Sequence, residues 1–192
     1  MSDKISPFSK LDLLPLEERL EISNAQQSLT IGIPKEYESN ENRVCLTPEA
    51  VHTLSCHNHM VIIEAGAGLA SNFTDEDYSL AGAEITTNRT KVFGSSIVMK
   101  VNPPTLEEIK WLSEKSILIS ALQLKTQKSK YFEALSSRKV TALAYEFIKD
   151  DSGALPIVRQ LSEIAGNASM LIAAEFLSDN EIGKGLLLGN IC

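Results

Sequence analysis

The chain is poor in cysteine, in long apolar runs and in positive charge. Its three cysteines, Cys45, Cys56 and Cys192, are odd in number and form no closely spaced pair, so the sequence indicates neither a disulfide framework nor a zinc site. No apolar run approaches the roughly 18 residues that a membrane-spanning helix needs. Basic residues number 18 against 25 acidic ones, and the net charge of −7 argues against non-specific nucleic-acid binding. We therefore expect a globular protein with no membrane span, no nucleic-acid partner and no bound metal.

The N-terminus also lacks the basic and then apolar profile of a secretory signal, which together with the unpaired cysteines predicts a cytoplasmic protein. Histidine is scarce as well, and His52, His57 and His59 all fall in one predicted helix and the turn after it. That region is away from the strand ends, where ligands bind in α/β sheets. Even with Cys56, the histidines match no recognised spacing of metal ligands.

The sequence does contain a regular alternation of short apolar segments and helix-start signals. The segments show little polar alternation, as strands of a parallel sheet covered on both faces require. Right-handed crossovers then give a doubly wound α/β fold, Rossmann-like or flavodoxin-like, with a mostly parallel sheet and helices on both faces. The strands are expected at 29–33, 60–64, 84–86, 97–101, 117–122 and 140–145. The helices are expected to begin at the caps Thr47, Thr74 and Thr105, and to cover 127–137 and 159–177.

Four parts are predicted along the chain. Residues 1–28 are interpreted as an N-terminal helical extension, 29–158 as a substrate-binding α/β domain and 159–178 as a long connecting helix. The last part, 179–192, contains three glycines that could be mistaken for a dinucleotide-binding turn. That turn needs G-x-G-x-x-G directly after a strand, whereas here no strand precedes the glycines and their spacing is one residue too long.

Two cations stand at the ends of neighbouring elements in this pattern. Arg43 lies in an acidic and polar loop before the first helix, and Lys100 ends an apolar strand. A guanidinium fits a carboxylate bidentately, and an ammonium is a compact charge that suits an oxygen developing negative character. Together they could hold a small 2-oxo or 2-amino acid. The alternatives are that Arg43 pairs with Glu41 or Glu36 on the surface, and that Lys100 merely reaches solvent with its charged end.

Nine short stretches occur in the order typical of one known family. They are 31–36 (IGIPKE), 41–48 (ENRVCLTP), 64–68 (EAGAG), 81–83 (AGA), 99–101 (MKV), 144–146 (AYE), 155–156 (LP), 162–166 (SEIAG) and 183–185 (GKG). The chain thereby resembles the N-terminal domain shared by alanine dehydrogenases and the alpha subunit of pyridine nucleotide transhydrogenases, and is closest to the former. The resemblance implies a substrate domain and a connecting helix, with the Rossmann domain that binds NAD missing from this chain.

The resemblance also implies roles for single residues. Arg43 and Lys100 match the arginine and lysine that hold the substrate carboxylate and polarise the reacting centre, and Ser162 matches a position that contacts a cofactor phosphate, or else it caps the long helix. Gln123 stands where alanine dehydrogenases have a proton-shuttling histidine, and because an amide does not titrate it could only orient the substrate. Lys125 is an alternative proton shuttle. Glu146, at a strand end, is expected to orient Lys100 or Arg43, or to be a simple surface acid.

The resulting prediction is the substrate half of an NAD-dependent, L-alanine dehydrogenase-like oxidoreductase. Such an enzyme converts alanine reversibly to pyruvate and ammonia, and it would be homo-oligomeric through the full-length protein. This chain alone should not turn over. Three alternatives stay open: a nucleotide-binding domain like that of transhydrogenases, a relative of lysine-forming saccharopine dehydrogenases with a bulkier substrate, and a non-catalytic module that senses a keto acid.

Overall fold

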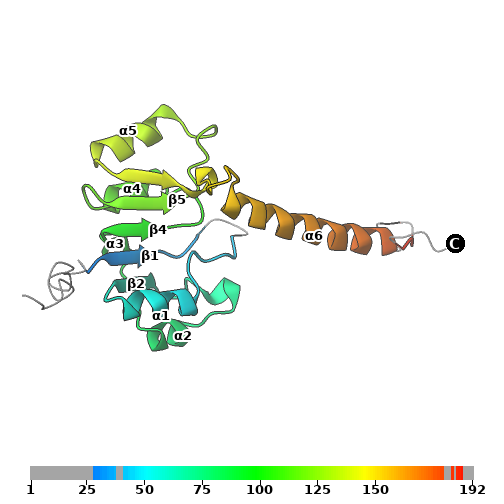
Figure 1. The fold of residues 1–192 in the computed structure, drawn as a ribbon, viewed down its shortest axis with the longest axis horizontal. Coiled ribbons are helices and arrows are strands. Elements are labelled where there is room, and N and C mark those ends of the chain that lie inside the picture. The colour runs from blue at the N-terminus through cyan, green and yellow to red at the C-terminus, as the bar shows by residue number, and fades with distance from the viewer. Residues whose placement is uncertain (1–27, 38–40, 180–182, 184, 188–192) are drawn as a thin grey trace, which may run out of the picture.

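The fold is a single parallel sheet of six strands with helices on both faces (Figure 1). It is seen in a computed structural model that describes residues 28–37, 41–179, 183 and 185–187. The strand order is β3-β2-β1-β4-β5-β6, and every neighbouring pair is parallel. This is the doubly wound order of Rossmann-type sheets. The predicted α/β class is therefore confirmed, and the sequence segments that were expected to be strands all contain one.

The strands are short and apolar. They are β1 (Thr30–Ile33), β2 (Met60–Glu64), β3 (Glu84–Thr86), β4 (Ile97–Met99), β5 (Ile117–Ser120) and β6 (Thr141–Ala144). The helices are α1 (Pro48–Cys56), α2 (Asp75–Leu80), α3 (Arg89–Phe93), α4 (Leu106–Trp111), α5 (Ser129–Ser137) and α6 (Pro156–Ser178), with 3₁₀ turns η2 (Leu69–Ser71) and η3 (Tyr145–Phe147). Among the described residues no helix is long and apolar enough to cross a membrane.

The core is divided by the sheet into two clusters. One cluster joins β1 and β2 with α1 and α2, and its largest buried side chain is Tyr78. The other joins β4 and β5 with α3, α4 and α5 around Phe93 and Leu118. Helices α1 and α2 therefore cover one face of the sheet and α3, α4 and α5 the other, and the direction of winding reverses between β1 and β4. Ligands of such sheets bind at this reversal, beyond the carboxyl ends of the strands.

Threonine caps start three of the helices, as the sequence predicts. Thr47 accepts a hydrogen bond from the backbone amide of Ala50 at the start of α1. Thr74 and Thr105 each form a complete capping box, in which the acid three residues later accepts from the amide of the threonine. These local contacts fix where α1, α2 and α4 begin.

Helix α3 is the element that the sequence analysis missed. It has five residues and lies in a segment with no capping box, although Asn88 accepts from the amide of Lys91 at its start. It packs tightly on β1: a Cβ atom added to Gly32 would lie 2.0 Å from the carbonyl oxygen of Val92. Glycine in β1 is thus what lets α3 approach the sheet. A smaller correction concerns β4, which ends at Met99, so Lys100 follows the strand.

Helix α6 extends away from the α/β layer (Figure 1). It begins at Pro156, three residues before the expected start, because proline suits the first turn of a helix. None of its residues is buried, and its apolar side chains include Ile164 and Leu171, which are 65% and 73% exposed. Its role as a connecting helix remains a prediction. The helical extension predicted for 1–28 and most of 179–192 lie outside the described residues.

Candidate functional site

A hollow of about 450 Å³ lies where the winding of the sheet reverses. Arg43 enters it from the β1–α1 connection and Lys100 from the end of β4, so the structure brings the two predicted cations to one concave surface. The remaining lining is mostly apolar. It consists of Val44, Cys45, Met99, Val101, Ile119, Tyr145, Ile148, Ile157 and Leu161.

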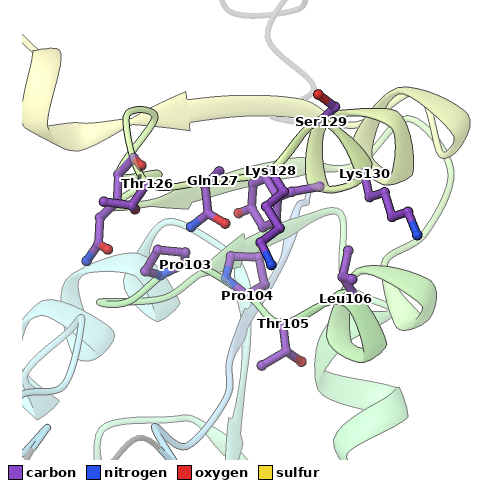
Figure 2. A pocket seen from close by; sticks show the side chains of 11 residues that line it. Pro103, Pro104, Thr105, Leu106, Thr126, Gln127, Lys128, Ser129 and Lys130 are labelled. Atoms are coloured by element: carbon purple, nitrogen blue, oxygen red, sulfur yellow. Dashed lines mark hydrogen bonds between the residues drawn. The ribbon is translucent and has the colours of Figure 1, made fainter.

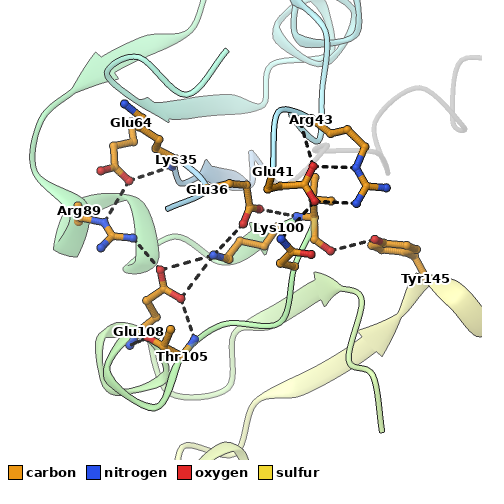
Figure 3. A network of polar contacts seen from close by, with 12 residues as sticks. Lys35, Glu36, Glu41, Arg43, Glu64, Arg89, Lys100, Thr105, Glu108 and Tyr145 are labelled. Carbon is orange, nitrogen blue, oxygen red and sulfur yellow. Dashed lines mark hydrogen bonds and ion pairs between the residues drawn. The ribbon is translucent and has the colours of Figure 1, made fainter. Parts of the chain in front are cut away.

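The guanidinium of Arg43 is held by Glu41 along one edge (Figure 3). Its Nε donates to Oε1 at 2.8 Å and its Nη2 to Oε2 at 2.7 Å. This bidentate contact raises the pKa of Arg43 and lowers the pKa of Glu41, and in both groups the hydrogen bond is the largest cause. The Arg43 side chain is 50% exposed. The pairing considered from the sequence therefore exists, and it coexists with a place in the hollow.

Lys100 is buried, with 3% of its side chain exposed. Its Nζ lies 3.0 Å from Glu36 Oε2 and 3.5 Å from both carboxylate oxygens of Glu108. The alternative that Lys100 only reaches solvent is wrong. A buried ammonium needs compensating charge, and these two buried carboxylates provide it.

Each of the two carboxylates is anchored to a backbone amide. Glu36 Oε1 accepts from the amide of Val101 at 2.7 Å, and Glu108 Oε2 accepts from the amide of Thr105 at 2.8 Å within the α4 capping box. Both amides lie just after β4. The carboxylates that hold the Lys100 head are thus fixed to the same stretch of backbone that carries Lys100.

Arg89, on α3, extends the network to a third carboxylate (Figure 3). Its Nη2 donates to Glu108 Oε1 at 2.7 Å and its Nε to Glu64 Oε2 at 3.2 Å. Glu64 also accepts from the amide of Lys35 and from the hydroxyl of Tyr37. The bond to Glu64 is the main reason why the pKa of Tyr37 is raised.

These network residues were missed in the sequence analysis as parts of the site. Glu36 and Glu64 could have been suspected, because each follows or ends an apolar strand as Lys100 does. Arg89 gives no such signal. It lies on the helix that the sequence did not predict, and only the packing of α3 brings it beside Glu108.

Gln123 and Ser162 lie in a second hollow, of about 740 Å³, and not in the one that holds Arg43 and Lys100. The two hollows share Tyr145 and Leu161 in their linings. Lys125 also lines the second hollow. The structure therefore arranges the predicted residues as two pairs in adjacent spaces.

Glu146 fixes the backbone of the Gln123 turn. Its Oε1 accepts from the amides of Leu122 and Gln123, both at 2.9 Å, and Gln123 takes a left-handed conformation with φ 48°. The expectation that Glu146 orients Lys100 or Arg43 is thus replaced by another role. It shapes the loop after β5 and so determines where the Gln123 side chain starts.

Ser162 does not cap α6. The residue preceding the helix is Leu155, and Ser162 lies in the second turn, where its hydroxyl donates to the carbonyl of Val158 at 2.8 Å. Its oxygen remains able to accept a hydrogen bond. The predicted contact with a cofactor phosphate would require the hydroxyl to turn away from Val158.

A third hollow, of about 740 Å³, shares Gln123 with the second hollow. Part of its lining is labelled in Figure 2. Pro103 and Pro104 line it from the connection after β4, and Lys128 and Lys130 line it from the start of α5. It lies next to the site, and the sequence analysis assigned nothing to it.

Other titratable groups near the site are held in their neutral form. Burial raises the pKa of Cys45 to about 12, and burial is also the largest cause of the raised pKa of Tyr145. The Tyr145 hydroxyl donates to the carbonyl of Val101 at 2.9 Å. No cluster of potential metal ligands occurs among the described residues.

Comparisons with known proteins agree on one family. The family described as alanine dehydrogenase/PNT, N-terminal domain, matches residues 32–165. The alanine dehydrogenase of Staphylococcus saprophyticus is 43% identical over 163 residues, and that of Methanococcus maripaludis is 40% identical over 164 residues. Each match covers 85% of this chain and 44% of the relative, so the chain spans less than half the length of these relatives.

Solved structures show the same relationship. An L-alanine dehydrogenase superposes with a TM-score of 0.80 at 34% identity, over 85% of this chain and 45% of that chain. A transhydrogenase from Sinorhizobium meliloti superposes with a TM-score of 0.58 at 28% identity, over 62% of this chain and 35% of that chain.

Proposed function

Because the chain belongs to the alanine dehydrogenase/PNT N-terminal domain family, we propose that it binds a small 2-oxo or 2-amino acid as the substrate-binding part of an L-alanine dehydrogenase-like oxidoreductase. The observation that carries the proposal is the common hollow of Arg43 and Lys100. Two cations from separate connections meet there at the place where α/β sheets bind ligands.

Arg43 anchors the substrate carboxylate in this proposal. Glu41 occupies the edge of the guanidinium formed by Nε and Nη2. The edge formed by Nη1 and Nη2 has two further N–H donors, which match a carboxylate bidentately. A substrate can therefore bind Arg43 without first breaking the contact with Glu41.

Lys100 polarises the oxygen or nitrogen on the α-carbon. Glu36 lies 3.0 Å and Glu108 3.5 Å from the ammonium nitrogen, and two carboxylates do not use all three of its hydrogens, so one is left for the substrate. The fixed carboxylates mean that this donor is oriented before the substrate arrives, and preorganised charge of this kind is effective in sites that exclude water. The apolar lining around Met99 and Ile119 suits a small aliphatic side chain.

Gln123 orients the substrate from the adjacent hollow, and Lys125, which lines the same hollow, is the proposed proton shuttle. Proton transfer at neutral pH needs such a titratable group, since an amide cannot supply it. Gln123 lies outside the hollow of the two cations. Its contact with the substrate therefore requires the substrate to extend past Tyr145 toward the second hollow.

NAD is the cofactor that this family relationship suggests, but the described residues do not fit it well. The connection after β1, residues 34–47, contains no glycine, whereas a dinucleotide needs a glycine-rich turn there. Ser162 is the one residue that we propose for contact with the cofactor. When bound, NAD would accept or donate the hydride, and most of its contacts would come from residues outside this chain. The proposal also places the protein in the cytoplasm as part of a homo-oligomer.

Calorimetric titration of this chain with pyruvate, L-alanine and NAD tests the proposal. We expect pyruvate to bind, and Arg43→Ala to weaken it by about tenfold or more, as loss of a charged hydrogen bond does. Arg159→Ala is the matched control, since Arg159 is 72% exposed on α6 and pairs with Glu163. Unchanged pyruvate binding in Arg43→Ala would contradict the assignment.

A second candidate function is the binding of nucleotide in the manner of a transhydrogenase subunit. It is favoured by the superposition on the Sinorhizobium meliloti protein and by the glutamine at position 123. In the same titration this function predicts binding of NAD with no binding of pyruvate or alanine.

A further inference from the structure

We propose that Arg89 is a positioning residue that keeps the Lys100 ammonium available to the substrate by occupying Glu108. The inference rests on the proposed function for its consequence in binding, and on the geometry of the buried network for its physical basis. No pattern in the sequence points to Arg89, and its role follows from where α3 places it.

Glu108 is shared unequally between two cations. Its Oε1 lies 2.7 Å from Arg89 Nη2 but 3.5 Å from Lys100 Nζ. Its other oxygen, Oε2, accepts from the amide of Thr105 at 2.8 Å and is also 3.5 Å from Lys100 Nζ. Both short contacts of Glu108 therefore go to groups other than Lys100. The ammonium is held closely by Glu36 alone, at 3.0 Å.

Arg89 itself has little freedom to move. Its guanidinium carbon lies 4.2 Å from the centre of the Tyr37 ring, 5.3 Å from that of Trp111 and 5.7 Å from that of Phe93. Its Nε donates to the buried Glu64, which is held by the Lys35 amide and the Tyr37 hydroxyl. A planar guanidinium can stack on rings and bind two carboxylates at once, and an ammonium cannot do both.

The charges in the network explain what loss of Arg89 would do. Among the described residues, Glu36, Glu64 and Glu108 form ion pairs with two cations, Lys100 and Arg89 (Figure 3). Without Arg89, Glu108 Oε1 loses its short partner and the nearest remaining cation is the Lys100 ammonium. The ammonium is then drawn to Glu108, and the hydrogen that would polarise the substrate is engaged there.

The test compares two acids that differ in the group that Lys100 recognises. Pyruvate has a carboxylate and a ketone, and propionate has the carboxylate without the ketone. The ratio of their dissociation constants therefore measures the Lys100 contact separately from the Arg43 contact. We expect Arg89→Met to lower the preference for pyruvate by about tenfold, the effect of losing one charged hydrogen bond. Arg43→Ala should weaken both acids together.

Arg89→Lys keeps the positive charge but cannot reach both carboxylates, so it should retain part of the preference, with a loss of about threefold. It also serves if Arg89→Met does not fold. Arg159→Met is the control for the change of arginine to methionine on the surface. A purely structural role for Arg89 would lower the folded fraction without changing the ratio, and an unchanged ratio in the folded variants would overturn the inference.

A second measurement does not depend on any ligand. The ε-methylene ¹³C resonance of Lys100 can be assigned by its disappearance in Lys100→Arg. We expect it to shift in Arg89→Met and to stay in place in Arg159→Met. If wild-type chain binds no pyruvate, the proposed function fails, and the inference is then decided by this resonance. An unshifted resonance in Arg89→Met overturns it whatever the binding result.

Discussion

Lys100→Met should destabilise the fold by an amount that the buried network sets. The substitution removes the cation from between Glu36 and Glu108, whose side chains are 6% and 5% exposed, and leaves both carboxylates with their backbone amides but without this charge partner. Methionine is similar in length to lysine, so little packing is lost. The loss of unfolding free energy therefore measures the removal of the charge and not the creation of a cavity.

The expected cost is about 3–5 kcal/mol in the free energy of unfolding, the range for breaking a buried ion pair by removing one partner. Domains of this size unfold with about 5–15 kcal/mol, so the variant should remain folded at 25 °C. Glu36→Gln in the same background removes one of the stranded charges, while its amide oxygen can still accept from Val101. The loss of unfolding free energy in the double variant should therefore be smaller than the sum of the losses in the two single variants, by about 1–3 kcal/mol.

Urea unfolding followed by circular dichroism measures all four proteins of this cycle. The control cycle pairs Lys100→Met with Glu163→Gln, because Glu163 lies on α6 and contacts Arg159 instead. There the costs should add within about 0.5 kcal/mol. The reasoning is refuted if Lys100→Met costs less than about 1 kcal/mol, or if the Glu36 cycle is as additive as the control.

Further predictions concern the fold and its titration. Gly32→Ala should cost about 3 kcal/mol or more in urea unfolding, because its Cβ would lie 2.0 Å from the Val92 carbonyl oxygen, and a cost below about 1 kcal/mol would contradict the close packing of α3. Cys45 should resist iodoacetamide at pH 8 while the exposed Cys56 reacts, because burial raises the pKa of Cys45 from 9.0 to about 12. Peptide mass spectrometry of the labelled native protein measures both rates, and equal rates would oppose this. The same shift means that stability falls as pH rises above about 9, where the unfolded thiol ionises and the folded one does not. Thr105→Ala should cost about 1 kcal/mol through loss of the cap of α4, and Thr105→Ser should restore most of it.

Much of the fold was predictable because its signals are local. Capping at Thr47, Thr74 and Thr105 depends on residues three positions apart, and the continuous apolar strands are typical of a parallel sheet covered on both sides. The segment of α3 carries no such pattern. Its helix forms where the glycine of β1 leaves room, which is a contact between residues far apart in the sequence.

The site was predictable only as a pair of residue types. Lys100 follows a strand end and Arg43 lies in the loop between the first strand and the first helix, and the parallel sheet brings them to one edge. Their partners were harder to foresee, since acids are frequent in this chain and only the folded structure distinguishes the buried Glu108 from an ordinary helix-capping acid. The capping role expected for Ser162 and the orienting role expected for Glu146 were wrong for the same reason: each depends on which of several nearby groups the side chain meets.

The balance of charge around Lys100 bears on the proposed binding of an anion in the hollow. Three buried carboxylates near two cations would repel a substrate carboxylate if their charge reached the hollow. Each carboxylate, however, is turned toward a backbone amide or a cation of the network: Glu36 to Val101, Glu64 to Lys35, and Glu108 to Thr105. Among the described residues Arg43 stands outside that network, half-exposed at the hollow. In the proposed function, Arg43 thus meets the substrate charge, and the network serves to hold a single ammonium at the reacting end.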